Sequence, residues 1–357
     1  MTSTTTPPHP ALAPPTSSTG ARNLLTDYDA TISQGPTLGY IVMYSVFGGE
    51  VTHETATAWF RELRLDQAML PGKLRLDNAF ERVTGSDGVH DTYNLADLDT
   101  PDPLTATPSV PAPAARVRSA NLMIRHVNRS TTKILRHIVR EVCDETAAEL
   151  AYDPYLGEVE FRRAFGRDGD GTLTVTLDHA AIANLPDAEQ ARVHAMADKI
   201  WERYRWQCTY LGSDRVRALL LKYIRTLDAI AVRPTGGVYF VNADHTSVLT
   251  RLGEFVDRVG GGSMLIHVPL PDQAQNRQLV IQSFVTSASD ELRKLSIDIA
   301  DARRNGINPN QLTALHQRYL AVQTRTARYS QRLETSLTTT EADLELVQRQ
   351  LSDLIAR

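Results

Sequence analysis

Cysteine is almost absent from the 357-residue sequence, which contains only Cys143 and Cys208. Their spacing suggests no metal cluster, so a reducing cytoplasm is the expected location. The N-terminus lacks a basic segment followed by an apolar one, and the most apolar run, residues 38–47, is too short to span a bilayer. We therefore expect a cytoplasmic protein with no membrane partner.

Aromatic residues and an excess of positive charge are also lacking. Aromatics make up 6% of the chain, and 38 basic residues face 42 acidic ones, which gives a net charge of −4. Without a global basic field, any nucleic-acid surface must be a local patch. Lysine is rare as well, and the resulting excess of arginine is typical of a GC-rich bacterial or phage genome. The length and the 42% hydrophobic content predict two or three folded units.

Composition and periodicity predict an α+β fold. Six segments are expected: a disordered Ser/Thr/Pro-rich tail (1–36), a small helical unit (37–84), an acidic and Pro-rich linker (85–116), an antiparallel β-meander (117–185), a winged-helix-like unit (186–272) and coiled-coil helices (273–357). In the meander, four cationic side chains could line one face and track a phosphate backbone: Arg125, Lys133, Arg136 and Arg140. A solvated outer face is the alternative that we favour there, because aromatics that could stack on bases are missing from these strands.

The winged-helix interpretation depends on the order helix, helix, hairpin. The stretch IAVRPTGGVYFV, residues 230–241, is typical of two short strands joined by a tight turn at Pro234, Gly236 and Gly237. A basic helix precedes it, and a wing would contact phosphate or the minor groove. The predicted nucleic-acid-binding residues are Arg215, Arg217, Lys222, Arg225 and Arg233. A purely structural corner is the alternative, since aliphatic residues surround these cations.

The strongest pattern is at the C-terminus, where apolar residues recur in steps of three and four from Ile281 to Leu354. Asn308, Pro309 and Gln311 predict a helix stop and restart, and hence an antiparallel coiled-coil hairpin. Thr338 can cap a further helix, so the pattern leaves open whether 309–357 is one helix or two. A continuous helix would leave an unpaired seam and favour a homo-oligomer, whereas an intramolecular three-helix bundle is the alternative. The predicted oligomerisation residues are Leu312, Leu315, Tyr319, Val322, Leu344, Val347, Leu351 and Leu354.

No phosphate-binding glycine loop, zinc dyad or nucleophile elbow is present, so we expect no catalytic residue, no metal and no cofactor. The stretch YDPYLGEVEF places Asp153, Glu158 and Glu160 along a strand, as some metal-dependent nucleases do. Phe161 and Arg162 stand where such sites have a lysine. A nuclease is therefore only a distant alternative.

The motif GGVYFV after an Arg-rich helix, DNAFERV near the N-terminus and the coiled-coil tail resemble a group of uncharacterised proteins from actinobacteria and their phages or plasmids. The resemblance spans most of 37–300 and implies no catalytic residue, since that group has no assigned activity. It implies that the protein comes from a mobile element.

Together, these features predict a non-enzymatic nucleic-acid-associated protein that oligomerises through its C-terminal coiled coil, with DNA or RNA as its partner. An oligomer would place several weak basic patches on one ligand. The rival prediction is a scaffold whose coiled coil binds a protein partner and whose hairpin only braces the fold.

Overall fold

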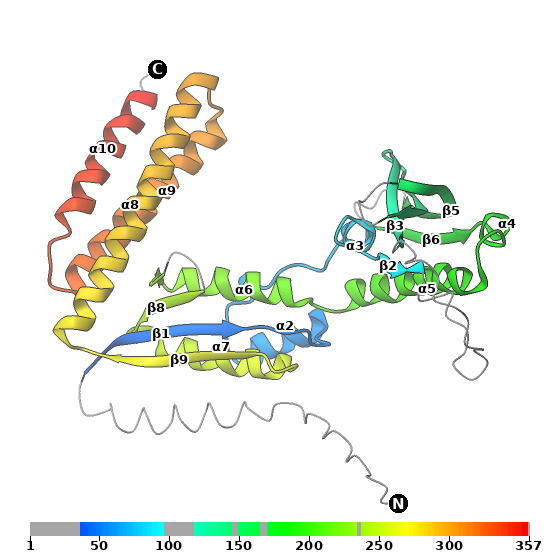
Figure 1. Ribbon diagram of the computed structural model, residues 1–357. Helices are drawn as coiled ribbons and strands as arrows, with labels where there is room; N and C mark the ends of the chain where they lie inside the picture. The colour runs from blue at the N-terminus through cyan, green and yellow to red at the C-terminus, as the bar shows by residue number, and fades with distance from the viewer. Residues whose placement is uncertain (1–35, 96–117, 145–148, 165–169, 234–236, 356–357) are drawn as a thin grey trace, which may run out of the picture. The chain divides into compact units, whose positions relative to one another are not determined.

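The computed structural model describes residues 36–95, 118–144, 149–164, 170–233 and 237–355 (Figure 1). The chain divides into two compact units. The first unit comprises Met1–Glu50, Glu54–Pro71 and Gly212–Arg357, and the second comprises Val51–His53 and Gly72–Leu211. Each contains one antiparallel sheet with helices, which confirms the predicted α+β class. None of the described helices combines the length and the apolar character that a membrane span requires.

The first unit contains a four-stranded antiparallel sheet of order β7-β8-β1-β9. Its elements are β1 (Thr37–Ser45), α2 (His53–Glu62), α6 (Ser213–Thr226), β7 (Ile230–Ala231), β8 (Val238–Asn242), α7 (Thr246–Val259) and β9 (Met264–Pro271). Strand β1 is central and pairs with both β8 and β9, with Val42 opposite Tyr239 and His267. Helices α2, α6 and α7 meet at three aromatic rings, because Phe60 lies edge-on to both Tyr223 and Phe255.

A three-helix bundle follows β9 in the first unit. It consists of α8 (Ala274–Asn305), α9 (Pro309–Arg332) and α10 (Thr338–Ile355). Asn308 and Gln311 form the predicted capping box, with Pro309 in the first turn, which confirms that stop and restart. Of the segment 309–357, the described residues to 355 form two helices rather than one continuous helix.

The bundle shares its core with the sheet. Ile230 of β7 and Phe240 of β8 belong to the same hydrophobic cluster as Phe284 of α8. The Phe284 ring stacks on Tyr329, with 4.9 Å between the ring centroids, and the Tyr329 hydroxyl donates to the Asp228 carbonyl at 2.8 Å. The base of the hairpin is therefore held by α9.

The second unit is a five-stranded antiparallel meander of order β2-β3-β4-β5-β6. Its elements are α3 (Leu76–Thr84), β2 (Asp91–Asn94), β3 (Ser119–Arg129), β4 (Lys133–Cys143), β5 (Glu149–Arg163), β6 (Gly171–Leu177), α4 (His179–Ile182) and α5 (Asp187–Thr209). Phe80 of α3 and Ile200 of α5 share a buried core with Phe161 of β5, so α3 and α5 contribute to the core of this sheet. Strands β3 to β6 occur where the alternating pattern predicts them.

The observed units differ from three of the predicted segments. The predicted helical unit 37–84 is divided, since β1 and α2 contribute to the first unit and α3 to the second. The predicted linker 85–116 contains β2, and the predicted winged-helix-like unit 186–272 is split between α5 and α6. The physical reason is long-range pairing: β1 pairs with strands about 200 residues away, which local periodicity cannot reveal. The predicted disordered tail, except Pro36, lies outside the described residues, as does most of the predicted linker.

The junction between β9 and α8 gives a pH-dependent prediction. Arg277 donates Nε and Nη2 to the two carboxylate oxygens of Asp272, at 2.5 and 2.8 Å, and these hydrogen bonds lower the pKa of Asp272. Because the folded-state pKa lies below the unfolded one, the pair stabilises the fold above the unfolded pKa, and this contribution is lost as pH falls through the folded pKa. Asp272→Asn should therefore destabilise the protein at neutral pH and have less effect at about pH 2. Urea unfolding at both pH values measures the difference, and an equal effect at both would contradict the prediction.

Candidate nucleic-acid interface

Helix α6 presents its cationic residues on one side. Its buried residues, Val216, Leu219, Leu220, Tyr223 and Ile224, form the inward half of the helix. Arg217, Lys222 and Arg225 are exposed, and Arg215 is half-buried. Successive residues of a helix are about 100° apart, so these four cations all fall on the outward half. Most of the apolar neighbours that suggested a core helix point the other way, whereas the half-buried Leu221 lies between Arg217 and Arg225.

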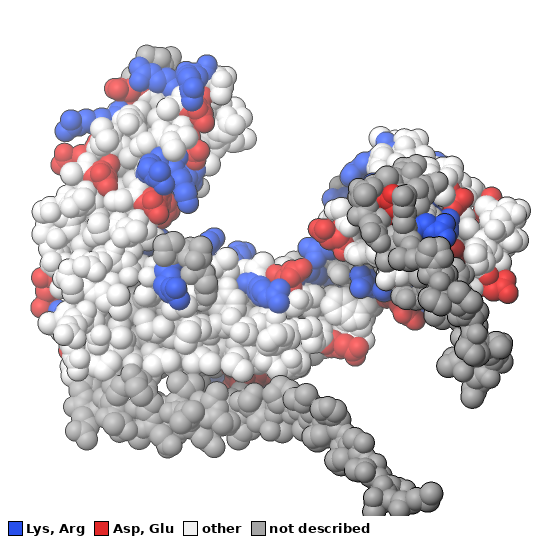
Figure 2. All heavy atoms as spheres, in the orientation of Figure 1, with Lys and Arg blue, Asp and Glu red and all other residues white. Residues whose placement is uncertain are grey.

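The five predicted contact residues differ in their surroundings. Arg217 donates Nη1 to Asp214 and Nη2 to the Val46 carbonyl, at 2.8 and 2.6 Å. Within the described part of the chain, the side chains of Lys222, Arg225 and Arg233 form no ion pair and no hydrogen bond. All three are exposed. Figure 2 shows Lys and Arg atoms at intervals over α6 and beside the hairpin, among mostly uncharged atoms. These three cations are available to a polyanion.

The hairpin is the second part of this surface. Strands β7 and β8 pair at two positions, Ile230 with Phe240 and Ala231 with Tyr239, which gives the predicted hairpin. Gly237, of the predicted wing turn, is exposed and has φ of 64°, a left-handed conformation that favours glycine. Pro234 and Gly236 lie outside the described residues. The hairpin is not free-standing, because β8 continues the sheet by pairing with β1.

Two tyrosines lie beside these cations, and the sequence did not single them out. Tyr44 of β1 and Tyr239 of β8 stack with 6.5 Å between ring centroids and 7° between ring planes. Burial raises the pKa of the Tyr44 phenol, Tyr239 raises it further, and the charges of Arg225 and Arg217 act in the opposite direction. The hydrogen bond from Arg217 to the Val46 carbonyl places this arginine at a residue two positions along the chain from Tyr44. The β1–β8 register brings the tyrosines together. In the sequence, the only signal for this is that Tyr44 lies two residues from Val42 and Tyr239 two residues from Val241, so each tyrosine shares a face of its strand with a valine.

Among the described residues, the sheet of the second unit offers no comparable cationic face. Arg136 and Arg140 point inward, where Arg136 binds Glu81 and the Thr84 carbonyl and Arg140 binds Glu189. Arg125 and Lys133 lie on the opposite face and pair with Glu141 and Glu160. The four cations therefore do not share one face, which contradicts that prediction. The physical reason is the alternation of side chains along β4. Arg136 and Arg140 are an even number of residues from the buried Ile134 and Ile138, so all four point to the same face.

Two of the three carboxylates of the distant nuclease alternative, Asp153 and Glu160, are engaged in ion pairs. Asp153 accepts from Arg140 at 2.9 Å, and Glu160 accepts from both Lys133 and Arg162. Glu158 lies opposite His137 in the β4–β5 ladder. Among the described residues there is no group of three or more His, Cys, Asp or Glu side chains that could hold a metal ion.

The predicted oligomerisation residues lie in the bundle core of the same chain. Seven are buried in one cluster, Leu315, Tyr319, Val322, Leu344, Val347, Leu351 and Leu354, and Leu312 packs against it partly buried. The apolar seam is thus covered by α8, α9 and α10 of one chain, which is the intramolecular alternative. This arrangement removes the unpaired seam from which the homo-oligomer was predicted.

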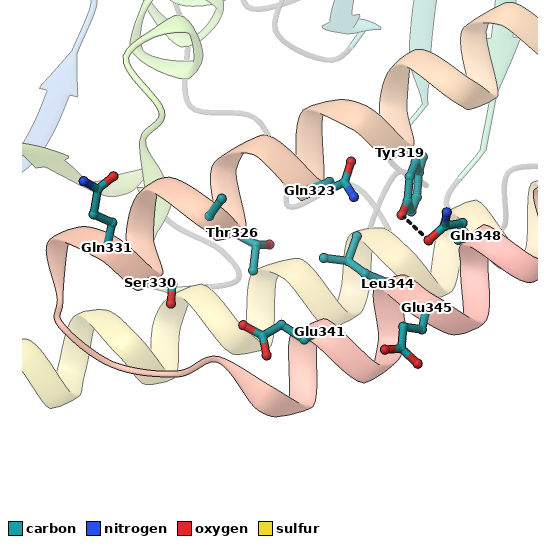
Figure 3. A pocket seen from close by; sticks show the side chains of 10 residues that line it. Tyr319, Gln323, Thr326, Ser330, Gln331, Glu341, Leu344, Glu345 and Gln348 are labelled. Atoms are coloured by element: carbon teal, nitrogen blue, oxygen red, sulfur yellow. Dashed lines mark hydrogen bonds between the residues drawn. The ribbon is translucent and has the colours of Figure 1, made fainter.

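A groove of about 660 Å³ lies between α9 and α10 (Figure 3). Its lining is mostly amide, hydroxyl and carboxylate, and includes Gln323, Ser330, Glu341 and Glu345. The Tyr319 hydroxyl donates to Gln348 Oε1 at 3.2 Å across the groove. This polar groove on the bundle is distinct from the cationic side of α6.

Comparison with known proteins gives one result. No curated protein and no solved structure matches the chain significantly. A family model matches residues 37–357, which include every described helix and strand. The chain therefore belongs to a family of unknown function, DUF6744.

Proposed function

We propose that this protein is a non-enzymatic nucleic-acid-binding protein whose phosphate contacts come from the outward side of α6 and from the adjoining hairpin. The observation that carries the proposal is the set of exposed cations Lys222, Arg225 and Arg233, which lack ion-pair partners among the described residues. Cations without carboxylate partners can replace the counterions of a phosphate backbone.

Exposed cations without an ion-pair partner also occur elsewhere among the described residues, for example Arg82, Arg203 and Lys294, so what distinguishes this surface is the grouping of three of them on α6 and the hairpin. Many other arginines are neutralised, such as Arg258 by Glu62 and Glu254, and Arg277 by Asp272. The inward arginines of the second unit are neutralised as well. A net charge of −4 makes the affinity modest, so binding depends on this local patch and falls steeply with salt.

Replacing Lys222 and Arg225 together by alanine should weaken nucleic-acid binding on the order of tenfold at low salt and reduce the salt slope by about 2, because each phosphate contact releases about one counterion. Fluorescence anisotropy with labelled duplex DNA, single-stranded DNA and RNA at several salt concentrations measures both quantities. Thermal stability should be unchanged, since both side chains are exposed.

Lys294→Ala is the matched control, because Lys294 is an exposed lysine of α8 that lies outside the proposed surface. It should leave affinity and salt slope unchanged. Arg233→Ala tests the hairpin separately and should act in the same direction as Arg225→Ala. Equal weakening by the control and the α6 variants would show that the charge effect is not local and would refute the site.

The groove between α9 and α10 favours a second candidate function, a scaffold that binds a protein partner through the bundle. Deletion of 309–357 would remove much of the buried core, so a point substitution is the cleaner test. Ala327→Arg places a long side chain in the groove, and Ala321→Arg changes an exposed residue of α9 that is not among those lining it. A partner bound in the groove is lost with the first variant and retained with the second.

Self-association stays a prediction, but the unpaired apolar seam from which it was predicted is absent from the described bundle. The seam residues are buried within one chain, so an oligomer would need another surface. Light scattering distinguishes the 39.6 kDa monomer from a dimer of twice that mass. The origin from a mobile element likewise stays a proposal and rests on the sequence resemblance alone.

A further inference from the structure

We infer that the ligand of this surface is single-stranded nucleic acid, DNA or RNA, whose bases stack on aromatic side chains beside the cations of α6. The inference rests on the proposed function and narrows it from a polyanion to a strand with accessible bases. It depends on three aromatic side chains, Phe47, Tyr44 and Tyr239.

Phe47 is the most accessible of the three. It follows β1 and is 53% exposed, which is unusual for a phenylalanine in a chain with only eight. Its backbone N–H donates to Ser263 Oγ at 3.0 Å, so the loop that carries it is tied to the turn before β9. The ring is thus presented to solvent by a fixed backbone.

A glycine turn lies beneath this ring. Gly260, Gly261 and Gly262 all have φ between 65° and 80°, the left-handed region that favours glycine. A Cβ at Gly262 would lie 3.9 Å from the Phe47 ring, and one at Gly261 would lie 2.3 Å from the Gly48 carbonyl oxygen. The missing side chains let the two loops approach closely and leave the outer surface of the ring open.

Cations connect Phe47 with the tyrosine pair. Arg217 Nη2 donates to the carbonyl of Val46, the residue before Phe47, and its charge also acts on Tyr44. The charge of Arg225, further along α6, also acts to lower the pKa of Tyr44. Tyr44 and Phe47 are three residues apart, roughly 10 Å along an extended chain. Phe47 therefore lies next to a residue held by Arg217 of α6, and the stacked tyrosines belong to the neighbouring strands β1 and β8.

An exposed ring near exposed cations matches the chemistry of a single strand better than that of a duplex. Proteins that bind single strands combine cations along the backbone with aromatic rings on which bases stack. The bases of a duplex already stack on one another, so exposed rings gain little from it. Lys222 and Arg225 can contact phosphates while the rings contact bases.

The test compares four labelled ligands of about 12 nucleotides, a length within the usual range of such sites. They are single-stranded DNA, single-stranded RNA, duplex DNA and an abasic strand that keeps every phosphate but has no bases. Anisotropy at one low salt concentration gives the affinities of the full-length protein. We expect the two base-bearing single strands to bind at least about fivefold more tightly than the abasic strand and the duplex.

Phe47→Ala should remove most of this preference, and Phe47→Trp should retain it, because tryptophan still offers a ring for stacking. Tyr152→Ala is the matched control, since Tyr152 is an aromatic residue of the second unit with 44% exposure. The fluorescence of 2-aminopurine placed in the strand reports stacking directly and should be quenched by the wild type and by Phe47→Trp but not by Phe47→Ala.

The outcomes separate this inference from the proposed function. Equal affinity for the abasic and base-bearing strands, with steep salt dependence, would overturn the stacking inference and leave phosphate binding in place. Tighter binding of the duplex would do the same. No binding of any ligand at low salt would refute the proposed function, and the inference with it.

Discussion

Arg140→Met should lower the free energy of unfolding of the second unit by about 3–5 kcal/mol, the usual cost of removing one partner of a buried ion pair. Arg140 Nε and Nη2 donate to the two carboxylate oxygens of Glu189 at 2.6 and 2.9 Å, and Nη1 donates to Asp153. Glu189 is only 2% exposed. Without Arg140 its carboxylate would be left buried beside Tyr93, whose hydroxyl donates to it at 2.6 Å.

Burial and hydrogen bonding to Glu189 both shift pKa values in this cluster. Burial alone would lower the pKa of Arg140, but its hydrogen bonds to Glu189 and Asp153 raise it above the ordinary value. Burial raises the pKa of Tyr93, and the hydrogen bond to Glu189 raises it further. Arg140 therefore stays charged near neutral pH, and its hydrogen bonds to Glu189 offset the cost of its desolvation.

Fluorescence can follow the second unit alone. In a Trp59→Phe background, the two remaining tryptophans, Trp201 and Trp206, both lie in α5. Urea unfolding in this background should show the lower free energy of unfolding of Arg140→Met. Arg125→Met, which removes an arginine 57% exposed in its side chain from a 3.8 Å pair with Glu141, should change stability by less than about 1 kcal/mol.

The double variant Arg140→Met with Glu189→Met should recover part of the loss, because no buried charge remains unpaired. A cost for the single variant as small as that of Arg125→Met would show that the network contributes little. In that case the apolar contacts of Phe80 and Ile200 would hold the two helices on the sheet.

Phe284→Ala should destabilise the first unit by about 3–5 kcal/mol, the usual cost of truncating a buried phenylalanine. Phe284 is 1% exposed, stacks on Tyr329 and lies in the cluster that joins the bundle to Phe240 of the sheet. Truncation leaves a cavity at the point where α8, α9 and the hairpin meet. Thermal unfolding followed by helical circular dichroism measures the loss.

Protein concentration adds a second readout that distinguishes an intramolecular bundle from a coiled coil between chains. If the seam is buried within one chain, the unfolding midpoint of the wild type should not change over about a hundredfold range of concentration. Leu346→Ala, at a leucine 55% exposed on α10, should cost no more than about 0.5 kcal/mol. A midpoint that rises with concentration would place the seam between chains and restore the predicted oligomer.

Local signals in the sequence determined much of the secondary structure. The capping box at Asn308 and Gln311 marks the start of α9 because its hydrogen bonds form within one turn of the helix. The alternating runs predict β3 to β6 because neighbouring strands of a meander are also neighbours in sequence. The cationic side of α6 is likewise local, since helical periodicity fixes which residues share a face.

Only the tertiary structure decided the remaining features, because they depend on contacts between residues far apart in the chain. The pairing of β1 with β8 places Tyr44 beside Tyr239. The packing of the second-unit sheet turns Arg136 and Arg140 inward, although the same residues read as an outer basic face. The apolar period of 309–357 predicts an apolar seam, but it does not tell whether a helix of the same chain or of another chain covers that seam. The break before Thr338 lets α10 fold back onto the same chain and cover it.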